Sequence, residues 1–173
     1  MKRVVFCLLF MICGTGLINC SAEIPAVPES FSFVFDYAGI MTESDKAAIC
    51  TYGQELLTFT GGSLWGDEVI AVIVESLDGI DGGEYVTRII NEWGTGDNSA
   101  VVLLATVDRE IQIGVGKGLD EKLNNHECSL ILDTNLSYFA NNDFSTGMLL
   151  VYRSVCNRIR EIRLSESRRF RSF

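Results

Sequence analysis

The sequence predicts a three-layer α/β/α sandwich around a mixed, mainly parallel sheet of about four strands, with one β-hairpin and about four helices. Two nearly continuous apolar runs, EVIAVIVE at 68–75 and AVVLLATV at 100–107, are rich in β-branched residues, which is typical of buried strands. Segments with apolar residues at three-to-four-residue spacing precede, separate and follow these runs. Strands that alternate with helices indicate a sheet covered by helices on both sides.

The first predicted helix covers 44–59 and follows an ordered loop at 36–40. Residues 42–45 (TESD) form a capping-box-like start, and apolar residues from Ile49 to Phe59 recur at near-helical spacing. Gly61 and Gly62 end this helix.

A second predicted helix joins the two apolar runs. It opens at Gly82, places Tyr85, Ile89 and Trp93 on one face, and stops at 94–96 (GTG). A strand, a helix and a parallel strand in this order form a right-handed crossover.

The rest of the chain predicts a hairpin and two helices. Asp108 and Arg109 turn the chain, and 110–116 alternates apolar and polar residues, which indicates an antiparallel strand. Helices are expected from about 126 to 140 and from about 145 to 162. The last one is amphipathic rather than membrane-spanning, because arginines interrupt it.

Charge is unevenly distributed over a chain whose net charge is -9. Seven arginines fall between 153 and 173, against Glu161 and Glu166, so the body before them is strongly acidic. An acidic body repels nucleic-acid phosphates and favours cations, which excludes nucleic acid as a partner. The basic segment either contacts an anionic surface or partner, or is a solvated helix face.

The N-terminus has the layout of an export signal over 1–22. Lys2 and Arg3 precede an apolar run, and small residues ending at Ala22 provide a cleavage point. A second interpretation stays open, because the segment 17–20 (LINC) resembles a lipoprotein box with Cys20 as the lipidated residue. Residues 23–33 are predicted to be an extended linker. We therefore expect an exported protein of the periplasm or cell envelope, either released or lipid-anchored.

Cysteine and histidine usage limits the chemistry of the domain. Cys50, Cys128 and Cys156 fall within helical segments, which favours buried free thiols; one disulfide with one free cysteine is the alternative. The single histidine, His126, excludes multi-histidine zinc sites within the chain. Residues 114–118 (GVGKG) lack the ending of a phosphate loop, so these glycines are expected to let the chain pass close to other backbone.

Carboxylates in loops are the remaining candidates for a functional site. Asp36, Asp97, Asp120 and Asp143 are predicted to converge at one end of the sheet and to hold Ca²⁺, or else Mg²⁺ or Mn²⁺, since hard cations prefer oxygen ligands. The neighbouring ligand-binding candidates are Asn98, Gly116, Lys117 and Gly118. The alternative is that Asp97 and Asp143 are turn and cap residues.

Seven segments in order resemble the TPM domain family. They include DYAGIM at 36–41, VIVESLDG at 72–79, NEWGTGDN at 91–98, DR at 108–109 and IQIGVGKGLD at 111–120. Tyr138, Phe139, Asp143 and Gly147 resemble the family's step into its final helix. The sequence departs from the family at Ser99, Lys117 and Asp120, and it lacks the family's glycine-rich tail and transmembrane helix.

The resemblance implies a small α/β/α domain, here 34–164 followed by the basic tail 165–173, on an exported or membrane-facing protein. Some family members act as acid phosphatases, some bind Ca²⁺, and others assist membrane complexes or receptors. Two hypotheses follow. The first is a monomeric envelope module that aids assembly or quality control of membrane proteins. The second is a metal-dependent phosphatase in which the four aspartates hold the cation and Arg109 or Lys117 orients the phosphate.

Overall fold

The computed structural model describes residues 23–62 and 66–170, so the predicted export signal and Cys20 lie outside the described residues. The elements are β1 (Val34–Asp36), α1 (Glu43–Thr60), β2 (Glu68–Val74), α2 (Gly82–Trp93), β3 (Ser99–Ala105), β4 (Glu110–Val115), α3 (Asn125–Ala140) and α4 (Phe144–Phe170). This order confirms the predicted α/β class, with four helices and a mixed sheet of four strands.

The sheet has the strand order β1-β2-β3-β4, with β1, β2 and β3 parallel and β4 antiparallel to β3. Its three longer strands coincide with the predicted ones. The fourth strand is β1, which has only three residues and pairs Asp36 with Ile73.

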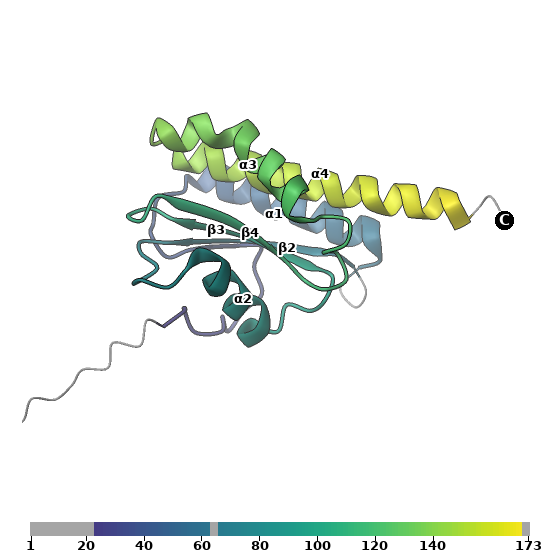
Figure 1. The fold of residues 1–173 in the computed structure, drawn as a ribbon, viewed down its shortest axis with the longest axis horizontal. Helices are drawn as coiled ribbons and strands as arrows, with labels where there is room; N and C mark the ends of the chain where they lie inside the picture. The colour runs from purple at the N-terminus through teal and green to yellow at the C-terminus, as the bar shows by residue number, and fades with distance from the viewer. Residues whose placement is uncertain (1–22, 63–65, 171–173) are drawn as a thin grey trace, which may run out of the picture.

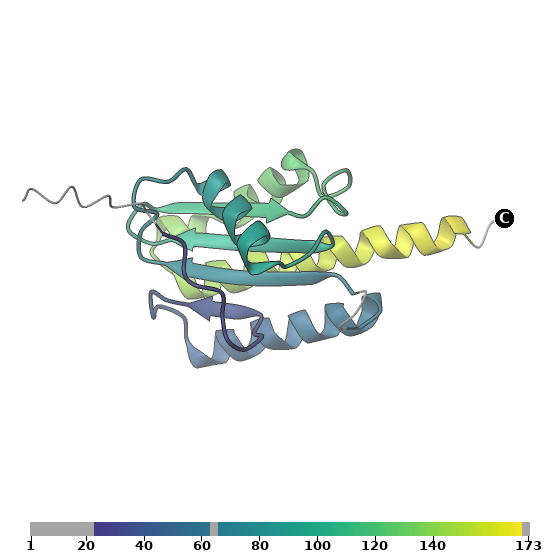
Figure 2. The same ribbon diagram turned by 90° about the horizontal axis from the view of Figure 1, so that it is seen from below.

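Helices cover both faces of the sheet, as Figures 1 and 2 show. One face carries α1, α3 and α4, and the other carries α2. Because β1, β2 and β3 lie side by side in chain order, helices on opposite faces give the two crossovers opposite hands. The loop after β1 and the loop after β2 therefore turn away from each other at the same edge.

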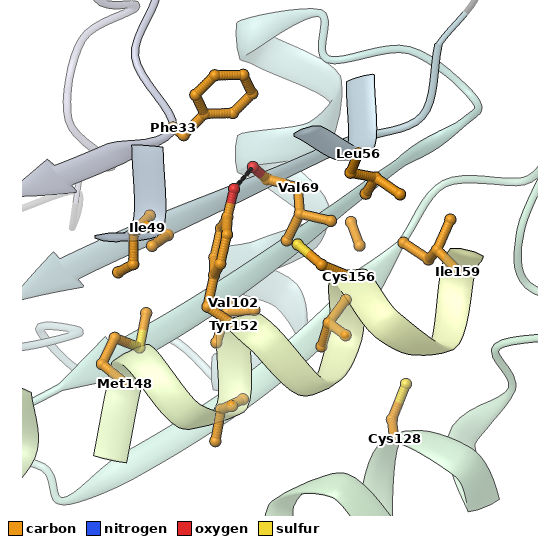
Figure 3. Close-up of a cluster of buried hydrophobic side chains, with 14 of the residues drawn as sticks. Phe33, Ile49, Leu56, Val69, Val102, Cys128, Met148, Tyr152, Cys156 and Ile159 are labelled. Atoms are coloured by element: carbon orange, nitrogen blue, oxygen red, sulfur yellow. Dashed lines mark hydrogen bonds between the residues drawn. The ribbon is translucent and has the colours of Figure 1, made fainter. Parts of the chain in front are cut away.

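The larger core lies between the sheet and the three-helix face. Figure 3 shows Tyr152 of α4 inside it, where the hydroxyl donates a 2.8 Å hydrogen bond to the carbonyl oxygen of Val69. Gly53 of α1 makes room for this arrangement, because a Cβ there would stand 2.4 Å from the ring of Phe33 and 2.5 Å from the Tyr152 hydroxyl. Tyr152 thus satisfies its polar atom within an apolar layer.

The smaller core lies under α2 and takes in the segment before β1. The segment 23–33, predicted as a linker, forms neither a helix nor a strand and packs on the domain. Ile24 is buried in this core, and the indole N–H of Trp93 donates to the carbonyl oxygen of Pro25 at 3.0 Å. On the same face, Gly114 of β4 allows close packing, because a Cβ there would meet Val86 at 1.9 Å.

The last helix is longer than predicted and runs past the end of the sheet (Figures 1 and 2). Three of its arginines pair with acids of the body: Arg158 with Glu127 of α3 at 2.8 Å, Arg160 with Glu55 of α1 at 3.7 Å, and Arg163 with Asp67. Much of the basic segment therefore fastens α4 to the acidic body. Arg168, in the last turn, makes no ion pair with a described residue and stays exposed.

The cysteines at 50, 128 and 156 are free thiols, which agrees with the first of the two predictions for them. Within 23–62 and 66–170, no helix has the length and apolar character needed to cross a membrane.

Candidate functional site

The carboxyl ends of the three parallel strands define one edge of the sheet, which we call the carboxyl edge. It consists of the loops at 37–42, 75–81 and 106–109. The chain leaves β1 toward one face and β2 toward the other, so the first two loops diverge at this edge. In open α/β sheets, ligands often bind where neighbouring loops diverge in this way.

Asp36 ends β1 at this edge, with a side chain that is 2% exposed. Its Oδ1 accepts a hydrogen bond from the backbone N–H of Ile40 at 3.2 Å, and its Oδ2 accepts one from Met41 at 3.0 Å. Oδ2 also pairs with Lys46 Nζ at 3.2 Å. The hydrogen bonds to Glu43 and then to Asp36 raise the pKa of Lys46. Asp36 therefore folds its own loop and has few lone pairs left for a ligand.

The second loop is held by the third one. Oδ2 of Asp108 accepts the N–H of Leu77 at 2.8 Å, and Ser76 Oγ accepts the N–H of Asp78 at 3.0 Å. Asp78 has φ of 51° and Gly79 has φ of 84°, so the chain makes a left-handed turn here. The turn leaves the Asp78 side chain exposed beside α2.

Tyr85 lies near both Asp78 and Tyr37. Burial raises the pKa of Tyr85, and the nearby Asp78 and Tyr37 raise it further. Burial also raises the pKa of Tyr37. Both phenols therefore stay protonated at neutral pH. Tyr85 is buried, whereas Tyr37 and Asp78 are exposed to solvent. These groups do not form a nucleophile with an adjacent base.

The carboxyl edge extends to the connection between α3 and α4. Arg109 donates to Asn142 Oδ1 at 3.0 Å and to the carbonyl oxygen of Phe139 at 3.3 Å. Arg109 has φ of 55° and Asn142 has φ of 61°. With Asp78, these are the non-glycine residues with positive φ in the described part of the chain, and all lie at this edge. Backbone strain of this kind is common at functional sites.

The opposite edge, which we call the amino edge, holds the predicted ligand-binding residues. The N–H of Gly118 donates to the carbonyl oxygen of Asp97 at 2.8 Å, and Asn98 Oδ1 accepts from Arg163 at 3.3 Å. A Cβ on Gly116 would stand 2.4 Å from the Asp97 carbonyl oxygen. These glycines thus let two loops close on each other, as the sequence predicted. Lys117 is exposed and forms no ion pair with a described residue.

The predicted convergence of the four aspartates is wrong. Asp36 and Leu104 both pair with Ile73, so they lie at the same height along the strands. Asp97, in contrast, lies before the start of β3. About seven residues of strand, or roughly 20 Å, separate the two levels. Asp120 follows β4 and lies at the amino edge with Asp97. The 16-residue helix α3 then carries the chain back, so Asp143 lies at the carboxyl edge with Asp36.

This division bears on the predicted calcium site. Within the described ranges, no group of three or more His, Cys, Asp or Glu side chains is placed to hold a metal ion. Asp97 and Asp120 are two exposed acids at one edge, and Asp36 is committed to its own loop. Since Ca²⁺ takes six to eight oxygen ligands, the four aspartates do not form the donor set that was predicted. Calcium binding by this chain stays a prediction, because the described residues do not assemble a site for the ion.

A charge network at the amino edge was missed by the sequence reasoning. Asp67, whose side chain is 1% exposed, accepts from Arg163 Nε at 2.8 Å and from Nη2. Arg163 also pairs with Glu166 at 3.0 Å, and Glu166 pairs with Lys122. The hydrogen bond to Asp67 raises the pKa of Arg163. Asp67 and Arg163 are 96 positions apart, so no local pattern marks the pair.

Comparisons with known proteins agree on the fold. No curated protein sequence gives a significant match. The N-terminal domain of protein cg2496 from Corynebacterium glutamicum is 20% identical with a TM-score of 0.59, covering 78% of this chain and 86% of that one. The N-terminal domain of a protein from P. gingivalis is 16% identical with a TM-score of 0.66, covering 73% and 81%. BA42 from Bizionia argentinensis is 13% identical with a TM-score of 0.59, covering 70% and 83%. These likenesses concern the fold alone.

The family comparison is more specific. The TPM domain matches residues 34–158, which spans β1 through most of α4. The matched region includes the loops of both edges and the step from α3 into α4. The chain therefore belongs to the TPM domain family.

Proposed function

We propose that this chain is an exported, non-catalytic TPM module that binds other proteins of the cell envelope and aids the assembly or quality control of membrane proteins. The use of the family-like carboxylates supports this proposal. Asp36 and Asp108 hold loops together through backbone N–H groups. A hydrolase would need such groups to face substrate. A binding module needs only the rigid surface that they create.

Export rests on the sequence pattern of 1–22 and is tested at the mature N-terminus. Mass spectrometry of the protein from envelope fractions is expected to find either a start at Glu23 or a lipid-modified Cys20. Recovery of the chain with Met1 intact, in the cytoplasmic fraction alone, would contradict export.

The binding role is tested by crosslinking in cells, followed by purification of the chain from detergent-solubilised envelopes. We expect one or a few membrane proteins to be enriched at least tenfold over a control. The control is a variant with a disrupted core, Tyr152→Asp, which loses the folded surface. Equal recovery with both proteins would contradict specific binding.

Phosphate-ester hydrolysis is the second candidate. The observation that favours it is the carboxyl edge itself, where the left-handed Asp78 is exposed near Tyr85. Turnover of p-nitrophenyl phosphate with Ca²⁺, Mg²⁺ or Mn²⁺ tests it. A rate lost in Asp78→Asn and kept in Asp97→Ala would place activity at the carboxyl edge. No turnover with any of the metals would exclude hydrolysis of this substrate class.

Calcium is tested separately by calorimetric titration of the wild type against Asp97→Ala and Asp120→Asn. A loss of binding in both variants would place Ca²⁺ at the amino edge. Equal binding in all three proteins would remove these two aspartates from the site.

A further inference from the structure

The free edge of β4 is an unpaired surface of the sheet. The N–H of Gly116 donates to Ser99, so hydrogen-bonded pairs alternate along the β3–β4 ladder from that point. The N–H and C=O groups of Ile111, Ile113 and Val115 therefore point away from β3. None of these groups makes another backbone hydrogen bond within the described residues.

This edge lacks the usual protection against strand pairing. β4 contains no proline or lysine, and its six residues pair with β3 without a bulge. Natural sheets generally block free edges by such features or by very short strands. The strand at the other side of the sheet, β1, follows this rule, because it has only three residues. The edge of β4 is thus open to an added strand.

Helices on both sides turn this edge into a groove, which we call the β4 groove. Gly83, Val86 and Thr87 of α2 form one wall, and Cys128 and Leu132 of α3 form the other, around a hollow of about 450 Å³. A second hollow of about 440 Å³ lies at the Glu110 end of β4. Ile111, Phe139, Phe144 and Leu136, which is 49% exposed, make this hollow apolar.

Two carboxylates stand at the ends of the β4 groove. Glu110 lies at one end and Asp120 at the other, and neither forms an ion pair with a described residue. Arg109, beside Glu110, directs its donors to Asn142 and Phe139 instead. The residues between the two ends are neutral. An occupant with positive charges at its ends and apolar side chains between them would complement this surface.

We propose that the β4 groove binds an extended segment of a partner protein, which adds to the sheet as a fifth strand. Main-chain hydrogen bonds to Ile111, Ile113 and Val115 hold the segment, and an apolar side chain fills the hollow beside Leu136. Basic residues about six positions apart meet Glu110 and Asp120. A second copy of the chain is a poorer occupant, because a net charge of -9 opposes self-association. The inference deepens the proposed binding role by naming its surface and the chemistry of its partner.

A designed peptide tests the chemistry. The probe is a fluorescein-labelled heptapeptide, Lys-Leu-Thr-Val-Thr-Val-Lys, and the control replaces both lysines by glutamate. Fluorescence anisotropy with the full chain is expected to show saturable binding of the lysine peptide, about tenfold tighter than that of the control. Asp120→Asn should weaken binding about threefold, the size of a rim ion pair. Failure of the lysine peptide to bind, or equal binding of both peptides, would overturn the proposal.

Two variants of one position test the site. Ile113→Pro removes an N–H that points outward and leaves the ladder to β3 intact, as edge positions allow. Ile113→Ala loses the same side chain but keeps the N–H. We expect peptide binding to fall at least tenfold in Ile113→Pro and at most twofold in Ile113→Ala. Amide shifts in NMR spectra should centre on Ile111, Ile113 and Val115. Equal binding by both variants, or shifts centred elsewhere, would refute the site.

The same variants separate this inference from the proposed function. If Ile113→Pro enriches the same envelope proteins as the wild type, the β4 groove is wrong while the binding role stands. If neither protein enriches any, the binding role itself fails. A dimer in sedimentation velocity that disappears in Ile113→Pro would show that the edge pairs with a second copy, which would overturn the partner proposed here.

Discussion

Removal of the Arg163 guanidinium is expected to destabilise the fold more than any other single charge change on α4. Arg163 is 25% exposed, but its partner Asp67 is 1% exposed and receives two hydrogen bonds from it. Arg163→Met leaves a buried carboxylate without a counter-charge, which costs about 3–5 kcal/mol. The partial exposure of the arginine places the expected loss near the lower value, about 3 kcal/mol. Arg163→Lys keeps the charge but loses the bidentate hydrogen bonding, so its loss of stability should be smaller.

Urea unfolding followed by circular dichroism measures this loss. For a domain of this size, with a slope of about 2 kcal/mol per M urea, the midpoint should fall by about 1.5 M. Arg168→Met is the matched control, because Arg168 is exposed on the same helix, and its change should stay within about 0.5 kcal/mol. A double-mutant cycle with Asp67→Asn should give a coupling of at least about 2 kcal/mol. Equal midpoints for the two arginine variants, or additive effects in the cycle, would refute the reasoning.

Three further predictions concern charge, thiols and packing. Lys122 and then Arg163 lower the pKa of Glu166. The contribution of Glu166 to stability is therefore present above the ordinary pKa of 4.5 and is lost as pH falls through the lowered pKa. Glu166→Gln should flatten the acid side of the curve of stability against pH, and an unchanged curve would contradict the pairing. Burial raises the pKa of Cys128 to about 11 and that of Cys156 to about 12. Of these two thiols and the half-buried Cys50, iodoacetamide at pH 8 should therefore modify Cys50 first, as measured by mass spectrometry of the native protein. Equal rates at Cys50 and Cys128 would argue against the buried thiols. Gly114→Ala should destabilise the fold by about 1–3 kcal/mol, because the added Cβ forces Val86 aside. Gly83→Ala should change thermal stability little, since its Cβ would meet only Asp81 Oδ1 at 3.1 Å. Similar melting temperatures for the two variants would show that α2 adjusts freely.

Local patterns were sufficient for most of the fold. The apolar runs that became β2 and β3 are buried along their whole length, and such strands have a clear composition. The strand β1 is harder to locate, because three residues carry little pattern. Phe31, Phe33 and Phe35 stand at every second position, which would place them on one face of a strand. Phe33 and Phe35 instead pack on opposite faces, because β1 begins only at Val34.

The candidate site was less predictable, because it depends on where the chain returns after each helix. The sequence predicts that Asp36 lies in a loop before the first helix and that Asp97 precedes a strand, but it does not show that these positions are opposite edges of a parallel sheet. Asp143 depends on the direction of α3, which reverses the expected side. The pairing of Asp67 with Arg163 depends on the register of α4 against the sheet. Contacts of this kind arise from packing of the complete domain rather than from local sequence.

The long last helix has a consequence for the order in which the domain can form. α4 supplies Met148, Tyr152 and Ile159 to the larger core, and it also supplies the counter-charge of Asp67. During synthesis these residues emerge after every strand of the sheet, so the face that α4 covers stays partly exposed until then. Fragments that stop before α4 would keep that apolar face open to solvent and other chains. The larger core of this domain therefore closes only once α4 has been made.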